Sequence, residues 1–169
     1  MPFREEDWLP SHEELDVPEL QLTSSVLRAG SLYYGKYCDY QCKEFMLCRD
    51  ETNDPRRCLN EGKEVTRCGF EFFSKVKTHC PDQFYDYWQC IDHSGNDMNF
   101  ENCRKTQNVF DECVKEKLGI ERPYVGYFSK IRLHDTQRPR FQLPPHKLPE
   151  KIPEPPNTDT APLPNRILD

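Results

Sequence analysis

The sequence predicts an all-α protein of two tandem antiparallel helical hairpins, each closed by two disulfides, with extended segments at both ends. Eight of its nine cysteines form four pairs with nine residues between the members: Cys38/Cys48, Cys58/Cys68, Cys80/Cys90 and Cys103/Cys113. Ten residues of α-helix rotate by roughly 1000°, which places both sulfurs of a pair on one broad face. The chain is also polar, with a mean hydropathy of −0.90. A small polar chain needs cross-links to be stable.

The N-terminal part is expected to contain two segments. Residues 1–22 should be extended, because three prolines punctuate them. Residues 23–37 should form a short amphipathic helix, since a Thr-Ser-Ser stretch offers an N-cap and apolar side chains follow at approximately helical spacing. We expect this helix to be interrupted or bent at Gly30 or Gly35.

The first hairpin is expected at residues 38–78. Cys48 and Cys58 are themselves nine residues apart, so spacing alone does not say whether the chain between them is helix or loop. Asp54 and Pro55 indicate a loop, because an N-cap carboxylate followed by proline marks the start of a helix.

The second hairpin is expected at residues 79–118. A break near Pro81 separates it from the first, Gly95 marks its turn, and Gly119 is a helix stop. The result is a duplicated helix–turn–helix unit.

Residues 119–169 are expected to form a proline-rich extended tail, since they hold ten of the fifteen prolines. Such a tail would be disordered when free, and its expected role is to lie along the surface of another protein. The expected anchors are its large apolar residues, namely Tyr124, Tyr127, Phe128, Ile131, Leu133 and Phe141.

Hairpin geometry removes nearly all of the possible cysteine pairings. The inner cysteines of an antiparallel pair of helices meet near the turn, and the outer ones meet at the open end. The predicted disulfides are Cys48–Cys58, Cys38–Cys68, Cys90–Cys103 and Cys80–Cys113. Each would contribute about 2–4 kcal/mol, mostly by restricting the unfolded chain.

Cys42 is left over, one helical turn after Cys38. We expect it to be a free thiol that serves as a small apolar filler. The alternative is that Cys42 competes with Cys38 for Cys68, because residues four apart on a helix present their side chains to nearly the same place.

Several function classes are disfavoured. The formal net charge is −6 without a clustered basic face, which argues against nucleic-acid binding. Residues 1–22 carry seven carboxylates and one arginine, as expected of a solvated tail or, alternatively, of a docking strip for a basic partner. Some of the aromatic side chains between Phe70 and Trp88 should face outward, because two thin hairpins do not enclose them all, and would form a protein-binding surface.

We expect neither a metal site, a catalytic site nor a cofactor. The sequence has no Cys-x-x-Cys, so a zinc site would have to use the single close pair Cys38 and Cys42 or the lone His79 beside Cys80. The five histidines are scattered, and no glycine-rich phosphate loop is present.

The compartment follows from the cysteines and the leader. Disulfides persist in oxidising compartments. Residues 1–8 resemble neither a secretory signal peptide nor a basic matrix presequence, and no apolar run is long enough to span a membrane. The sequence therefore predicts the mitochondrial intermembrane space, with a secreted disulfide-rich binding module as the alternative.

The paired spacing on two hairpins resembles the twin-CX9C (coiled-coil-helix-coiled-coil-helix, CHCH) proteins of that compartment. Within them, four stretches resemble the accessory 19 kDa (PGIV-type) subunits of respiratory complex I, NADH:ubiquinone oxidoreductase. These stretches are Lys-Glu-Phe-Met-Leu-Cys-Arg at 43–49, Asp-Pro-Arg-Arg-Cys-Leu at 54–59, Tyr-Trp-Gln-Cys-Ile-Asp at 87–92 and Phe-Asp-Glu-Cys-Val at 110–114. The resemblance covers roughly residues 20–125, and Cys42 departs from the family pattern.

The resemblance implies a non-catalytic structural or assembly subunit, peripheral to the inner membrane on its intermembrane-space side. Its partners would be other membrane-arm subunits and, during import, the oxidoreductase of the disulfide relay. It would support electron transfer from NADH to ubiquinone indirectly. The alternative is a twin-CX9C assembly factor or metallochaperone, although copper chaperones carry adjacent cysteines before the motif and here Tyr37 precedes Cys38.

Overall fold

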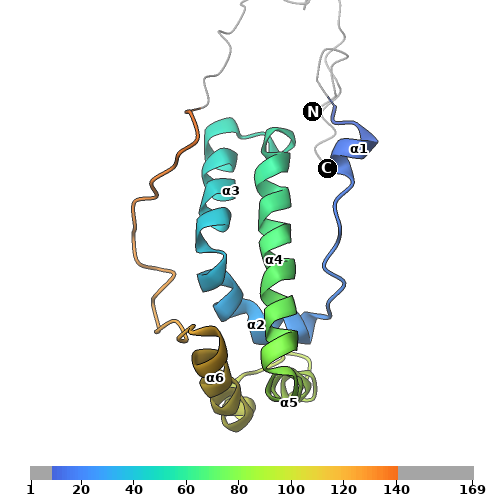
Figure 1. The fold of residues 1–169 in the computed structure, drawn as a ribbon, viewed down its shortest axis with the longest axis vertical. Helices are drawn as coiled ribbons and strands as arrows, with labels where there is room; N and C mark the ends of the chain where they lie inside the picture. Colours follow the sequence, from blue (N-terminus) through green and yellow to red (C-terminus); the bar gives the residue numbers. More distant parts are fainter. Residues whose placement is uncertain (1–8, 141–169) are drawn as a thin grey trace, which may run out of the picture.

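The computed structural model describes residues 9–140, and the regular elements among them are all helical. They are α1 (His12–Leu15), α2 (Ser24–Tyr37), α3 (Asp39–Thr52), the 3-10 helix η1 (Pro55–Cys58), α4 (Leu59–His79), α5 (Pro81–Asp92), the 3-10 helix η2 (Glu101–Cys103) and α6 (Arg104–Leu118). The all-α prediction is confirmed. Helices α3 and α4 stand side by side as the first hairpin, and α5 and α6 form the second at the end of α4 (Figure 1).

Two extended segments flank the first hairpin. The segment after α1 runs beside α4, and the segment after α6 runs along the opposite side, beside α3 (Figure 1). Helix α6 stops at Gly119, whose φ of 68° lies in the left-handed region that favours glycine.

Helix α2 is continuous, so the expected interruption at Gly30 or Gly35 is wrong. The two glycines serve close packing. A Cβ atom at Gly30 would lie 2.7 Å from Cε1 of Phe73, and one at Gly35 would lie 3.1 Å from Cζ of Phe128. Gly30 therefore has to be small, and Gly35 is tightly packed, because an aromatic ring of another segment rests against the helix backbone at each position.

Residues 12–15 also depart from the expectation of an extended N-terminal segment, because they form the single turn α1. A capping box stabilises this turn. The hydroxyl of Ser11 accepts from the backbone N–H of Glu14, and the Glu14 carboxylate accepts from the N–H of Ser11 at 2.8 Å.

The apolar core lies where α2, the second half of α4, α5 and α6 meet. Phe110 is fully buried and packs against the rings of Tyr33, Phe84 and Tyr87, with centroids 5.6, 5.1 and 5.7 Å away. The other fully buried aliphatic and aromatic side chains here are Phe72, Val76, Ile91 and Val114. The second hairpin and α2 thus share one apolar core.

The first hairpin is different. Among the residues of α3, Asp39–Thr52, Cys48 is the one that is fully buried. Met46 in the same helix is 68% exposed. Phe45 and Leu47 are half-buried, and the Phe45 ring lies near Gly62 of α4, so α3 has less apolar burial than the helices of the second hairpin and depends in part on other links.

Candidate functional site

The structure brings the eight paired cysteines together across each hairpin. Disulfides Cys38–Cys68 and Cys48–Cys58 join the two sides of the first hairpin, and Cys80–Cys113 and Cys90–Cys103 join those of the second. The Cα–Cα distances of the four bonds are 6.0, 5.9, 6.1 and 5.8 Å, within the usual range for disulfides. The bonds fix the spacing of the helices and make the molecule a rigid support.

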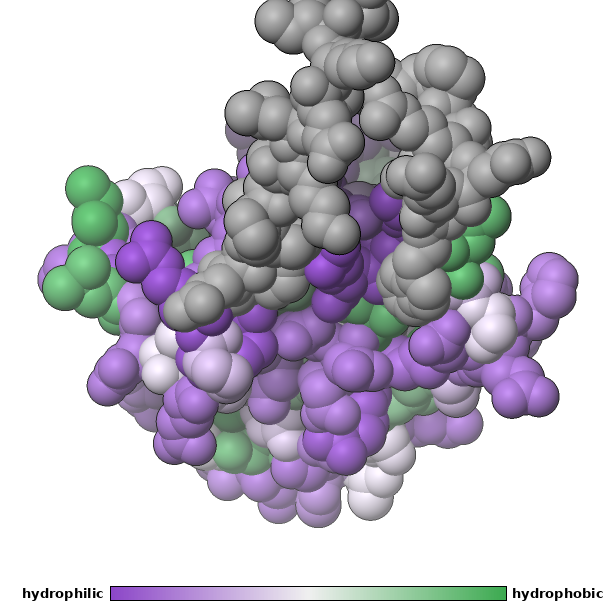
Figure 2. All heavy atoms as spheres, turned by 90° about the horizontal axis from the view of Figure 1, so that it is seen from above, coloured by the Kyte–Doolittle hydropathy of each residue, from purple (hydrophilic) through white to green (hydrophobic). Residues whose placement is uncertain are grey.

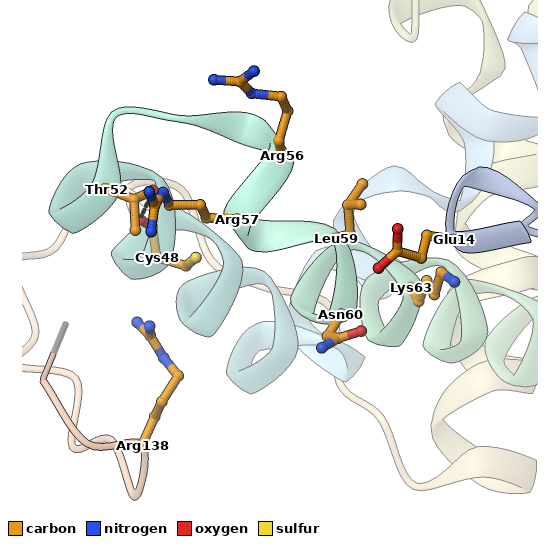
Figure 3. A pocket seen from close by; sticks show the side chains of 9 residues that line it. All are labelled: Glu14, Cys48, Thr52, Arg56, Arg57, Leu59, Asn60, Lys63 and Arg138. Atoms are coloured by element: carbon orange, nitrogen blue, oxygen red, sulfur yellow. Dashed lines mark hydrogen bonds between the residues drawn. The ribbon is translucent and has the colours of Figure 1, made fainter. Parts of the chain in front are cut away.

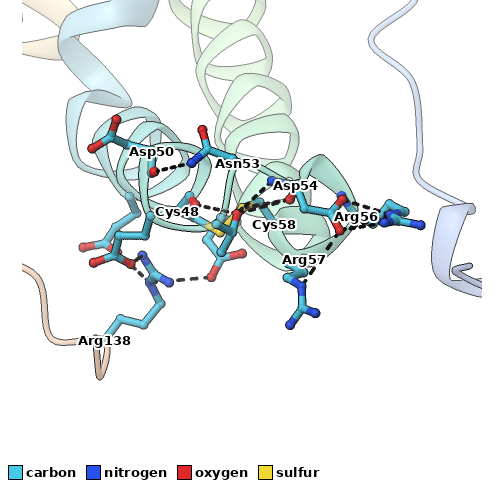
Figure 4. Close-up of a disulfide and its surroundings, with 12 residues drawn as sticks. Cys48, Asp50, Asn53, Asp54, Arg56, Arg57, Cys58 and Arg138 are labelled. Carbon is cyan, nitrogen blue, oxygen red and sulfur yellow. Dashed lines mark hydrogen bonds and ion pairs between the residues drawn. A yellow bond between two sulfur atoms is a disulfide. The ribbon is translucent and has the colours of Figure 1, made fainter. Parts of the chain in front are cut away.

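Asp54 organises the turn of the first hairpin beside Cys48–Cys58 (Figure 4). Its carboxylate accepts from the backbone N–H of Arg56 at 3.0 Å and from the guanidinium of the same residue at 2.9 Å, and Pro55 occupies the first helical position. The hydrogen bond from the Arg56 side chain holds the pKa of Asp54 below its ordinary value of 3.8, more than burial raises it. The turn therefore uses the ionised carboxylate.

We expect Asp54→Asn to make the stability of the protein less sensitive to acid. Because the pKa of Asp54 is lower in the folded state than its ordinary 3.8, its stabilising contribution is complete above that pH and is lost as the pH falls through the lowered value. The loss should amount to about 1 kcal/mol, the size of an N-cap interaction. Urea unfolding at neutral pH and below pH 3.8 measures it, with Asp50→Asn, an exposed residue on the other side of the turn, as the control. Equal acid sensitivity of the wild type and Asp54→Asn would contradict this role.

Cys42 forms no disulfide in the structure and is half-buried in α3. Burial, followed by the nearby carboxylate of Asp39, raises the pKa of its thiol. Because the thiolate is the reactive form, this environment makes Cys42 a poor nucleophile and a poor metal ligand.

A polar cavity of about 410 Å³ lies at the tip of the first hairpin (Figure 3). Arg57 and Arg138 reach toward it from the turn and from the C-terminal segment, and Glu14 and Lys63 lie at its other end. The arginines engage carboxylates of the same chain, including Arg57 with Asp54. The charged side chains that line the cavity thus include members of ion pairs that stabilise the hairpin itself.

A second, apolar groove of about 600 Å³ lies between α4, α5 and the extended segment before α2. Phe70 and Tyr85 line it and are 39% and 50% exposed, and Tyr85 packs edge-on against Trp88 at 5.1 Å. Charged side chains of the lining are Glu19 and Lys77. The expectation that some aromatic residues between Phe70 and Trp88 face outward is confirmed.

No sequence pattern predicts the other wall of this groove, to which Leu20, Leu22 and Val26 contribute. Leu20 also reaches α4, because a Cβ atom at Gly69 would lie 2.7 Å from its Cδ1. The sequence offers only a short apolar stretch at the end of an acidic segment.

Seen from above in Figure 2, the face of the molecule is mostly hydrophilic, with hydrophobic side chains gathered toward its edges.

The described part of the C-terminal segment first contacts α6 and α2, and its residues 134–138 lie on the first hairpin. Among the expected anchors, the rings of Tyr124, Tyr127 and Phe128 pack in series, with centroids 5.6 and 5.0 Å apart. Ile131 and Leu133 are 95% and 100% exposed. Phe141 lies outside the described residues. Hydrogen bonds, ion pairs and a ring contact hold residues 134–138, and no local sequence pattern predicts them.

Within residues 9–140, no group of three histidine, cysteine or carboxylate side chains is arranged to hold a metal ion. In the same range, every helix is too short or too polar to cross a membrane.

Comparison with known proteins relates the chain to subunits of NADH–ubiquinone oxidoreductase. No family model matches it. It is 29% identical over 108 residues to the NADH-ubiquinone oxidoreductase 20.8 kDa subunit of Neurospora crassa, which covers 63% of this chain and 58% of the relative. It is 32% and 31% identical over 90 residues to NADH dehydrogenase (ubiquinone) 1 alpha subcomplex subunits 8-A and 8-B of Arabidopsis thaliana, over 53% of this chain and 82% and 83% of the relatives. The chain belongs to the family of NADH dehydrogenase (ubiquinone) 1 alpha subcomplex subunit 8.

Proposed function

We propose that this chain is a non-catalytic accessory subunit of mitochondrial respiratory complex I, NADH:ubiquinone oxidoreductase, of the 19 kDa PGIV type. The observation that carries the proposal is its 32% identity over 82% of a relative named as a subunit of that dehydrogenase. The rigid disulfide-linked hairpins support a bracing role. On this proposal, the chain supports electron transfer from NADH to ubiquinone indirectly, by stabilising neighbouring subunits.

The proposed location is the intermembrane-space face of the membrane arm, peripheral to the inner membrane. Four disulfides in the structure support it, because such bonds persist in oxidising compartments. The proposed import route is oxidation by the disulfide relay, which would leave the pairs of the structure in the mature protein and Cys42 as a free thiol. Peptide mapping of the protein isolated under thiol-blocking conditions tests both the pairing and Cys42.

We propose the apolar groove between α4 and α5 as a contact surface for another subunit of the membrane arm. Aromatic side chains are enriched at the centres of protein interfaces, and here they are already fixed by the helices that carry them. Phe70 and Tyr85 are the exposed members and would lose most solvent contact on assembly.

Native gel electrophoresis of mitochondrial membranes tests the function. A stoichiometric subunit is expected to co-migrate with intact complex I, and depletion of the chain should lower the amount of the assembled complex. If the chain migrates only with subcomplexes, it is an assembly factor. If depletion leaves the level and activity of complex I unchanged, the proposal fails.

Replacement of Tyr85 by aspartate is expected to reduce incorporation of the chain into complex I by about tenfold, because a charge would be buried at the interface. Val109→Asp is the matched control, since Val109 lies on α6 of the same hairpin and is 54% exposed, against 50% for Tyr85. Both purified variants should keep the circular dichroism of the wild type. Equal incorporation of the two variants would show that the groove is not the contact surface.

A further inference from the structure

Three glutamates of the first hairpin converge on one arginine of the C-terminal segment. Arg138 Nη2 donates to Glu51 Oε2 at 2.9 Å, while its Nε lies 3.7 Å from Glu44 Oε2 and 3.9 Å from Glu61 Oε1. Glu44 and Glu51 belong to α3, and Glu61 belongs to α4. The three carboxylate side chains are 13%, 18% and 19% exposed, so their attraction to Arg138 is screened much less than that of a surface pair.

Residues next to Arg138 bind the same surface. His134 Nε2 lies 2.7 Å from Glu44 Oε1, and the hydroxyl of Thr136 donates to Glu44 Oε2 at 3.0 Å. The His134 ring also packs on Tyr40, with centroids 5.2 Å apart. Both oxygens of Glu44 are therefore used, although this residue is 90 positions away from His134 in the sequence.

The contact is local and polar. Residues 134–138 follow Ile131 and Leu133, which face solvent, and the previous packed anchor is Phe128 against Gly35. Earlier in the segment, Phe128 packs on Gly35 and Arg122 pairs with Asp111 of α6 at 3.1 Å, while charges and hydrogen bonds hold residues 134–138. Without the arginine, three poorly solvated carboxylates would face one another, which is unfavourable.

We propose that Glu44, Glu51 and Glu61 form a docking site for an arginine-bearing extended segment, and that its occupant is residues 134–138 of the same chain. This strap crosses from α3 to α4, because Arg138 lies against carboxylates of both helices. It adds a non-covalent link to a hairpin that has little apolar core of its own. It also keeps Ile131 and Leu133 at the surface between two attached points. The inference does not depend on the proposed function.

Hydrogen exchange of the full, oxidised chain tests the strap. Arg138→Ala is expected to accelerate amide exchange in α3 by about tenfold, because this helix carries Glu44 and Glu51 and loses its link through the strap to α4. Glu51→Ala should have a smaller effect of the same sign. Arg140→Ala removes an equal charge from an exposed position two residues away and should leave exchange unchanged.

The double variant separates a direct pair from two independent losses. If Arg138 binds Glu51, then Glu51→Ala should add little once Arg138 has been replaced. Equal effects of Glu51→Ala in both backgrounds would overturn the proposed pair. Exchange in α3 that slows with rising protein concentration would also overturn the inference, since the occupant would then come from a second copy.

Discussion

Loss of the Cys48–Cys58 disulfide in a Cys48→Ser/Cys58→Ser variant is expected to lower the free energy of unfolding by about 2–4 kcal/mol and to release α3 from α4. The reason is the composition of this hairpin. Cys48 is the one fully buried residue of α3, so the Cys48–Cys58 disulfide does much of the work that apolar packing does in other helices. Amide exchange of α3 and the helical circular dichroism measure the effect.

The matched control is Cys90→Ser/Cys103→Ser in the second hairpin. The two bonds close similar stretches, with sequence separations of 10 and 13, so their effects on the unfolded chain are nearly equal. The helices of the second hairpin also bury Tyr87, Ile91 and Phe110. We therefore expect α5 and α6 to stay paired when this bond is removed. Equal local opening of both hairpins would contradict the difference between them.

Replacement of Phe110 by alanine is expected to lower the free energy of unfolding by about 3–5 kcal/mol. Phe110 is fully buried on α6, and its ring contacts Tyr33 of α2 together with Phe84 and Tyr87 of α5. Its loss would leave a cavity at the point where three helices meet. Urea unfolding of the oxidised protein gives the change directly.

Val109→Ala, one residue earlier in α6 and largely exposed, should change the free energy of unfolding by less than about 0.5 kcal/mol. A comparable loss in both variants would mean that α2 and the second hairpin do not share a core. A partly buried hydrogen bond from the Tyr33 hydroxyl of α2 to Asp111 of α6, at 2.6 Å, also joins α2 to the second hairpin. Burial and the Asp111 carboxylate raise the pKa of Tyr33 above its ordinary value of 10.0, so its hydroxyl stays protonated even in alkaline solution where a free tyrosine begins to ionise.

The helices could be predicted because their signals are local. The cysteine spacing indicated two hairpins, Asp54-Pro55 indicated the turn, and Gly119 indicated the end of α6. The continuity of α2 was not predicted, because the role of Gly30 depends on Phe73, which is remote in the sequence.

The ionic contacts of the C-terminal segment could not be predicted for the same reason. Arg138 and Glu51 lie 87 residues apart, and no local pattern relates them. The proline content predicts an extended tail, and residues 119–140 form turns and extended chain, but the prolines gave no information on which surface these residues cover. The apolar groove could be predicted only in part. The aromatic run is visible in the sequence, whereas the contribution of Leu20 and Leu22 depends on how the chain folds.

The scarcity of buried apolar side chains in α3 also has a thermal consequence. The heat-capacity increment of unfolding comes from hydrating apolar surface, and local opening of α3 exposes little of it. The free energy of that opening should therefore vary with temperature with less curvature than expected where Phe110 and its neighbours separate. Cooling should therefore weaken the packing around Phe110 more than the attachment of α3 to α4.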